Sequence, residues 1–181
     1  MKLYVMRHGP AEDDAPSGRD ADRALTTPGR ERVVAVAKAL VTESEAPFAI
    51  ISSPLVRALQ TAEIVADITH LARRSRDDKK AQIGGATGEV EIRRELGMGT
   101  DKLALLAELV RAGRKRVMIV GHEPDLSMLV MSLVGRALEQ GMQKAMVVGV
   151  KLTADPRVAG LEFRSTLRFV LDPKSLTWQR D

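Results

Sequence analysis

Short apolar runs alternate with segments of helical periodicity along most of this chain. The runs cover residues 3–6, 48–52, 90–93 and 116–122, and the helical segments that follow them begin near residues 28, 54, 101 and 124. Such an alternation favours a mostly parallel sheet with helices packed on both faces. The sequence therefore predicts an α/β fold, a three-layer sandwich. Two further apolar runs, 145–152 and 161–171, predict two more strands, with an antiparallel strand near the carboxyl end.

The composition is that of an ordinary globular chain. Its 181 residues, 44% hydrophobic and 29% charged, suit a single domain over residues 1–181. Aromatic residues make up 3%, too few for stacking on nucleic-acid bases, and the absence of cysteine excludes disulfides and thiolate nucleophiles. The net charge of +4 favours anionic partners without selecting one. Because Arg7 and His8 interrupt the first apolar run and no run reaches about 18 apolar residues, we expect no signal peptide, no membrane partner and a cytoplasmic location.

Two polar stretches break the alternation. Residues 10–23 form a loop that leads away from the first strand, and residues 73–88, rich in arginine, lysine and glycine, predict a mobile excursion. The basic part of this second stretch is interpreted as a solvated surface, with docking of an acidic protein as the alternative. Both stretches would influence which substrates reach a site at the strand ends.

The chemistry-bearing residues gather where apolar strands end. The first strand runs into Arg7, His8 and Gly9, and a later strand ends at His122. Carboxyl ends of strands in such sheets face the crevice where ligands bind. Either histidine alone could be a hydrogen-bonded residue closing a strand, but two in equivalent places favour a shared site. Our hypothesis is that His8 is a nucleophile and Arg7 a phosphate clamp.

An ordered set of motifs resembles the histidine phosphatase superfamily, the phosphoglycerate mutase-like branch with the Arg-His-Gly motif. The set spans residues 3 to about 152 and comprises Arg7-His8-Gly9, Leu25-Thr26 with Gly29, Ser53-Pro54 with Arg57, Gln60 and Thr61, and Gly121-His122-Glu123. The small size and the stretch at residues 120–124 are most similar to the SixA-like phosphohistidine phosphatases. The resemblance implies a phosphoglycerate mutase-like fold.

The resemblance also implies roles for individual residues. His8 would be phosphorylated during turnover, and the phosphate would be bound by Arg7, Gly9, Arg57 and His122. Glu95 matches the position of a catalytic acid in many members, although it could equally be a solvated loop carboxylate; Glu12, Glu123 and Asp125 rank below it. No pair of histidines has helical metal-ligand spacing, so we expect neither a metal nor a cofactor.

Phosphoryl-transfer chemistry suits these residue types. Charge spreads over the oxygens of a transferring phosphoryl group, and the planar guanidinium of arginine can donate two parallel hydrogen bonds to them. Positive charge from Arg7 and Arg57 would keep His8 neutral and able to attack. We expect His122, beside the bound anion, to carry a proton.

Three functions follow from the sequence. The first is a phosphatase that works through phospho-His8, of the SixA protein phosphohistidine phosphatase type. The second is a small-metabolite phosphatase or a phosphoglycerate mutase-like enzyme, and the third is a non-catalytic module that binds phosphorylated ligands. The expected partners are a phosphorylated protein or a small phosphorylated metabolite, without nucleic acid.

Overall fold

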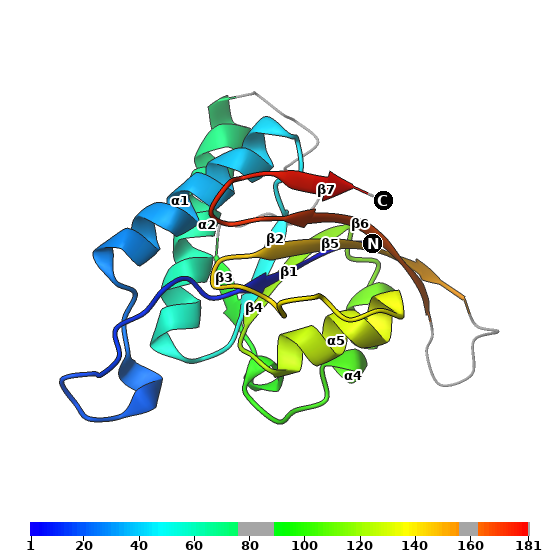
Figure 1. Ribbon diagram of the computed structural model, residues 1–181. Helices are drawn as coiled ribbons and strands as arrows, with labels where there is room; N and C mark the ends of the chain where they lie inside the picture. The colour runs from blue at the N-terminus through cyan, green and yellow to red at the C-terminus, as the bar shows by residue number, and fades with distance from the viewer. Residues whose placement is uncertain (76–88, 156–162, 181) are drawn as a thin grey trace.

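The computed structural model describes residues 1–75, 89–155 and 163–180, with no account of the side chains of residues 71–75. Within these residues one sheet has the strand order β3-β2-β4-β1-β5-β6-β7 (Figure 1). Its strands are β1 (Lys2–Arg7), β2 (Ala49–Ser52), β3 (Val90–Ile92), β4 (Arg116–Gly121), β5 (Val147–Ala154), β6 (Phe163–Leu171) and β7 (Trp178–Arg180). β1 to β4 are parallel to one another, whereas β5, β6 and β7 continue the sheet in antiparallel pairs.

Helices cover both faces of this sheet. α1 (Thr27–Thr42) and α2 (Val56–Ser75) pack on one face, and α4 (Lys102–Arg111) and α5 (Asp125–Val134) pack on the other (Figure 1). Two short 3₁₀ turns, η1 (Asp20–Asp22) and η2 (Arg94–Leu96), lie in the connections. The predicted three-layer α/β sandwich is therefore confirmed, although half of the sheet is antiparallel. None of the helices that the structure describes has the length and apolar character needed to cross a membrane.

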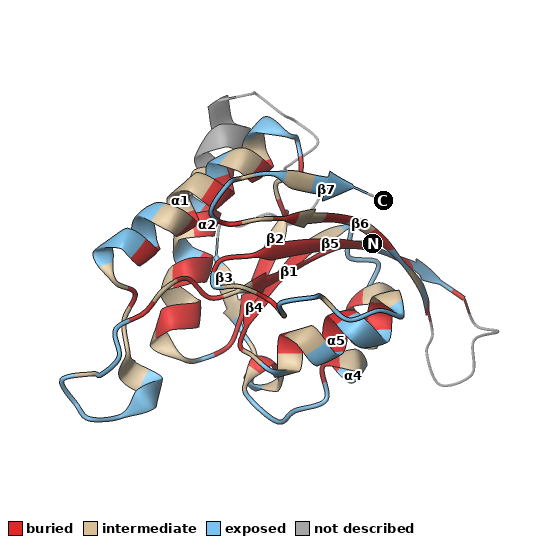
Figure 2. Ribbon diagram, viewed as in Figure 1, coloured by how far each residue is buried: buried red, intermediate tan, exposed pale blue. Residues whose placement is uncertain are grey.

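The alternation of side chains along β1 explains why two separate cores form. Leu3 and Val5 belong to the core under α4 and α5, while Tyr4 and Met6 belong to the core under α1 and α2. A strand with helices on both sides buries every side chain, so it is apolar throughout instead of alternating with polar residues. Figure 2 shows the central strands as the most deeply buried part of the molecule.

Several elements begin one or two residues from their expected starts. α1 begins at Thr27 and not at residue 28, and its cap is Thr26, whose side chain accepts the hydrogen bond from the Gly29 amide. α2 begins at Val56, so Ser53 and Pro54 belong to the preceding turn. β7 was not predicted. The expected excursion at residues 73–88 falls largely outside the described residues, from residue 76 onward.

Gly29 allows the chain that leaves β1 to pack on the start of α1. A Cβ atom at Gly29 would lie 2.0 Å from the carbonyl oxygen of Pro10, which no side chain permits. The Thr26 amide donates to the same oxygen at 3.1 Å. These contacts fix the path of the backbone directly after His8.

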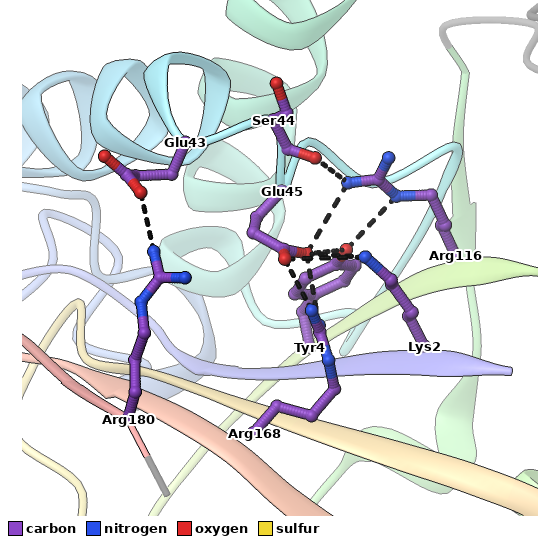
Figure 3. Close-up of polar contacts among 8 residues, drawn as sticks. All are labelled: Lys2, Tyr4, Glu43, Ser44, Glu45, Arg116, Arg168 and Arg180. Atoms are coloured by element: carbon purple, nitrogen blue, oxygen red, sulfur yellow. Dashed lines mark hydrogen bonds and ion pairs between the residues drawn. The ribbon is translucent and has the colours of Figure 1, made fainter.

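A buried carboxylate, that of Glu45, links the end of α1 to the sheet. It lies at the amino-terminal ends of β1 and β4, opposite the strand ends that carry the histidines. Glu45 accepts hydrogen bonds from Tyr4 Oη at 2.8 Å and from Arg168, and it pairs with Lys2 at 3.3 Å and Arg116 at 3.6 Å (Figure 3). Burial alone would raise its pKa, but the hydrogen bonds from Arg168 and Tyr4 and the surrounding positive charge lower the pKa to about 2.

We expect Glu45→Gln to lower the free energy of unfolding at pH 7 by about 1 to 3 kcal/mol, because it leaves cations without their carboxylate. The folded-state pKa of Glu45 lies below its ordinary value of about 4.3. Its stabilisation is therefore complete above about pH 5 and disappears as the pH falls toward 2. Urea denaturation of wild type and variant, measured from pH 7 to pH 2.5, should show that the difference between their free energies of unfolding becomes smaller as the pH falls.

Glu43→Gln is the matched control, since Glu43 is an exposed residue that pairs only with Arg180 among the described residues. It should change stability by less than about 1 kcal/mol. A Glu45→Gln protein as stable as the wild type at pH 7 would contradict this account.

Candidate active site

The two histidines meet because β1 and β4 are neighbouring parallel strands. Arg7 is paired with Gly121 in the register, and the His8 amide donates to the Gly121 carbonyl at 3.1 Å. The next residue of each strand is a histidine, and the two imidazole ring centroids lie 5.1 Å apart. The structure thus brings together two side chains that are more than a hundred residues apart in the sequence.

His8 has one defined ring nitrogen available for chemistry. Its side chain is buried, and Nδ1 lies 2.7 Å from the Gly9 carbonyl oxygen. A carbonyl oxygen can only accept, so Nδ1 carries the proton and the lone pair of the neutral ring lies on Nε2. Burial lowers the His8 pKa to about 3; the hydrogen bond to Gly9 opposes this shift, and the positive charges of Arg57 and Arg7 add to it. The expected neutral ring is found, but burial contributes more to it than the arginines do.

His122 is held from the opposite side by a serine. Its Nε2 lies 2.8 Å from Ser53 Oγ in the turn after β2, while its buried Nδ1 has no protein partner. Burial, followed by the charge of Arg57, lowers the His122 pKa to about 4. The ring is therefore neutral without a bound anion, and the expected proton on His122 beside a bound phosphate stays a prediction.

Arg57 points into the same region from the first turn of α2. It is buried, and its terminal nitrogens donate to the Asp20 carbonyl at 2.7 Å and to Asp20 Oδ2 at 3.0 Å. Arg7 donates from Nη1 to the Met142 carbonyl at 2.7 Å. In both arginines the terminal nitrogens are oriented by the protein, while Nε has no protein partner.

Buried nitrogens without a protein partner are concentrated here. Among the described residues three of them, Arg7 Nε, Arg57 Nε and His122 Nδ1, belong to residues of the predicted pocket. Arg23 Nε, next to the pocket, forms an ion pair with Asp20 at 2.9 Å and is therefore not free. An arginine Nε is always a donor, and His122 Nδ1 is a donor when the Ser53 hydroxyl donates to Nε2. A buried donor without a partner is costly, so a cluster of such donors indicates a place where a ligand accepts hydrogen bonds.

Arg57 reaches the pocket from a strand-helix turn that is not adjacent to β1. β4 lies between β1 and β2 and contributes His122. The ends of three strands, rather than two, thus surround His8. The turn at Ser53 continues this layer, since its amide donates to the Val120 carbonyl at 3.0 Å.

Gly9 has a structural task in the contacts that the structure describes. Its amide donates to Thr61 Oγ1 at 3.0 Å, and Thr61 in turn donates to the Arg57 carbonyl at 2.7 Å. A Cβ atom at Gly9 would lie 2.7 Å from Val33 Cγ2. Gly9 therefore links the segment after β1 to α2, and its amide already donates to Thr61, which does not favour the predicted phosphate contact.

Glu95 lies in η2, beyond the edge strand β3. Its carboxylate accepts from Arg93 at 2.8 Å and 3.2 Å, and these hydrogen bonds lower its pKa. A general acid at neutral pH needs a raised pKa. The contacts of Glu95 therefore do not favour the predicted role of a general acid.

Glu123, ranked lower from the sequence, lies near enough to Arg7 to raise the pKa of that arginine, and it accepts a hydrogen bond from Ser127 Oγ at 2.9 Å.

Asp20 and Ser53 are the site residues that sequence reasoning missed. Ser53 was named only as part of the Ser53-Pro54 motif, without a role, but its hydroxyl contacts His122. Asp20 lies in a loop with several acidic residues, and nothing in the sequence distinguishes the one that meets Arg57.

Among the described residues there is no group of three or more histidine, cysteine, aspartate or glutamate side chains that could hold a metal ion.

The imidazole NMR signals should report this environment. We expect His8 and His122 to remain neutral from pH 8 down to pH 5, with pKa values of about 3 and about 4. Arg57→Met should raise the His122 pKa more than that of His8, because the Arg57 charge ranks second only to burial for His122. A wild-type His122 pKa above 6 would contradict the described burial.

Comparison with known proteins agrees with this geometry. A model of the histidine phosphatase superfamily (branch 1) matches residues 3–82. An uncharacterized protein of Picosynechococcus is 36% identical over 126 residues, which covers 70% of this chain and 68% of that protein. The phosphohistidine phosphatase SixA of Escherichia coli is 30% identical over 133 residues, 74% of each chain.

A solved structure of the protein histidine phosphatase SixA complexed with tungstate has the same fold. It superposes with a TM-score of 0.76 at 25% identity and covers 98% of this chain and 100% of that one. The extent of these matches, together with the paired histidines and buried arginines, shows that the chain belongs to the histidine phosphatase superfamily and is most similar to its SixA-like members.

Proposed function

We propose that this phosphatase removes phosphate from phosphohistidine in proteins through a covalent phospho-His8 intermediate. The observation that carries the proposal is the set of buried donors without protein partners, Arg7 Nε, Arg57 Nε and His122 Nδ1, beside a neutral His8 with a free Nε2. Phosphate oxygens would satisfy these donors, and the phosphorus atom would then lie close to the attacking nitrogen.

The first half of the reaction transfers the phosphoryl group. The Nε2 lone pair of His8 forms a bond to phosphorus, and the bond from phosphorus to the leaving nitrogen or oxygen breaks with its electron pair. Arg7 and Arg57 hold the equatorial oxygens, whose negative charge they stabilise in the transition state. The Nδ1 hydrogen bond to Gly9 stabilises the positive charge that the His8 ring gains.

The second half regenerates the enzyme. Water attacks the phosphorus of phospho-His8, the bond to Nε2 breaks with its electron pair, and inorganic phosphate leaves. Because both leaving groups can be imidazole nitrogens, the two halves have similar demands. The P–N bond of phosphohistidine breaks readily once its imidazole is protonated, and neutral histidine leaves, so this substrate class does not require an acid such as Glu95.

His122 would change its protonation with the occupancy of the pocket. Burial and Arg57 keep its ring neutral in this structure. A bound phosphate would add negative charge beside Nδ1 and raise the pKa of His122. His122 would then take up a proton when substrate binds, and its ring would carry a positive charge only in the occupied pocket.

His8→Ala should reduce the hydrolysis of an aryl phosphate by at least about 1,000-fold, because the nucleophile is lost. Wild type should also retain an acid-labile phosphate label from substrate, and the variant should not. His70→Ala replaces a histidine of α2 outside the described pocket contacts and is the control. Hydrolysis by His8→Ala at the wild-type rate would contradict the mechanism, and a wild type without burst or turnover would indicate a binding module.

Substrate preference separates the remaining alternatives. We expect a higher kcat/KM for phosphohistidine peptides or phosphorylated protein domains than for phosphoglycerates. The reverse order would favour a small-metabolite phosphatase, and interconversion of phosphoglycerates would favour a mutase.

Asp20→Asn should raise KM for a phosphorylated substrate by about fivefold with a smaller change in kcat, because Arg57 loses the partner that orients it. Asp22→Asn is the matched control: Asp22 lies in the same turn but pairs with Arg19. A fall in KM would instead show that the Asp20 carboxylate competes with substrate for Arg57.

A further inference from the structure

A cavity lies at the amino-terminal end of β1, away from the histidines. It has a volume of about 650 Å³ and is lined by five cationic residues, Lys2, Arg114, Lys115, Lys151 and Arg168. Lys2 and Arg7 are at opposite ends of β1, which separates the two places by about 17 Å along the strand. This cavity is therefore distinct from the pocket around His8.

Positive charge in this cavity is only partly neutralised. Lys2 and Arg168 share the single carboxylate of Glu45 with Arg116 (Figure 3). Arg114 lies 3.8 Å from Glu91, and none of the described residues that line the cavity is acidic.

Two of the five cations have no counterion among the described residues. Lys115 and Lys151 are exposed and form no ion pair with the part of the chain that the structure describes. Like charges that converge on one concave surface repel one another, and an anion would relieve that repulsion.

The helix that ends at the cavity does not account for this charge. α4 ends at Arg111, and cations such as Arg114 near a helix carboxyl end interact favourably with its dipole. Lys2 and Lys151 come from β1 and β5 instead, and Arg168 comes from β6. Four separate parts of the fold thus direct cations to one cavity.

The remaining lining is apolar. Val110, Leu152 and Ala154 contribute to the wall. The volume lies within the range of about 300 to 1,000 Å³ that small-molecule sites occupy. A ligand suited to this lining carries several negative charges at one end and an apolar part at the other.

We propose that this cavity binds an organic polyphosphate, such as a nucleoside triphosphate, as a site separate from the phosphatase pocket. The lysine ammonium groups and the arginine guanidinium groups would donate charge-assisted hydrogen bonds to the phosphate oxygens. The apolar wall would contact the base. The proposal is independent of the reaction proposed for His8.

The test is a titration of the ¹⁵N-labelled protein followed by amide NMR shifts. ATP, inorganic tripolyphosphate and adenosine serve as probes, and the His8→Ala variant is titrated beside wild type so that turnover cannot remove the ligand. We expect ATP to shift the amides of Gly113, Lys115 and Lys151 in both proteins. Tripolyphosphate should bind more weakly than ATP, and adenosine weakest.

The double variant Lys115→Glu/Lys151→Glu should weaken ATP binding at these amides by at least about tenfold. Both side chains are exposed, so the fold should be retained. Lys38→Glu, on the exposed side of α1, is the matched control and should leave binding within about twofold.

Three results would overturn the proposal. One is the absence of shifts at Gly113, Lys115 and Lys151 with either anion. Another is unchanged ATP affinity in the double variant. If tripolyphosphate bound as tightly as ATP, the assignment of an organic ligand would be wrong.

Discussion

The parallel pairing of β1 with β4 is the constraint on which the candidate site depends. Its register places Arg7 opposite Gly121, so both strands end at the same level and each continues into a histidine. β2 lies on the other side of β4 and delivers Ser53 to His122. Hydrogen bonds between strands thus determine the distance between the reactive side chains, and the helices fix the sheet by covering both faces.

Burial has opposite effects on the two kinds of residue in the pocket. It disfavours the charged form of an imidazole, which keeps the His8 ring neutral. Arginine stays charged even when buried, so Arg7 and Arg57 need partners. A backbone carbonyl and the loop carboxylate of Asp20 supply them in part, which orients the guanidinium groups and leaves Nε unpaired. Glu45, at the amino-terminal ends of β1 and β4, shows the opposite arrangement: there a buried carboxylate is surrounded by several cations.

Much of the fold was predictable because strands and helices have different periodicities and this chain follows them closely. The errors were local. Thr26 and Thr27 are chemically equivalent as caps, so only the backbone path decides which one accepts the Gly29 amide. The amide of Gly9 and the carboxylate of Glu95 were assigned from motif position, and neither assignment takes account of neighbours such as Thr61 and Arg93 that engage them.

The sequence alone determined the layers, the strand that ends in Arg7 and His8, and the second strand that ends in His122, because apolar periodicity and motif order are local properties. Only the tertiary structure decided that β4 lies between β1 and β2, that Nε2 of His8 is free, and that Asp20 orients Arg57. These depend on strand order, hydrogen-bond partners and burial, and all three arise from contacts between residues far apart in the chain.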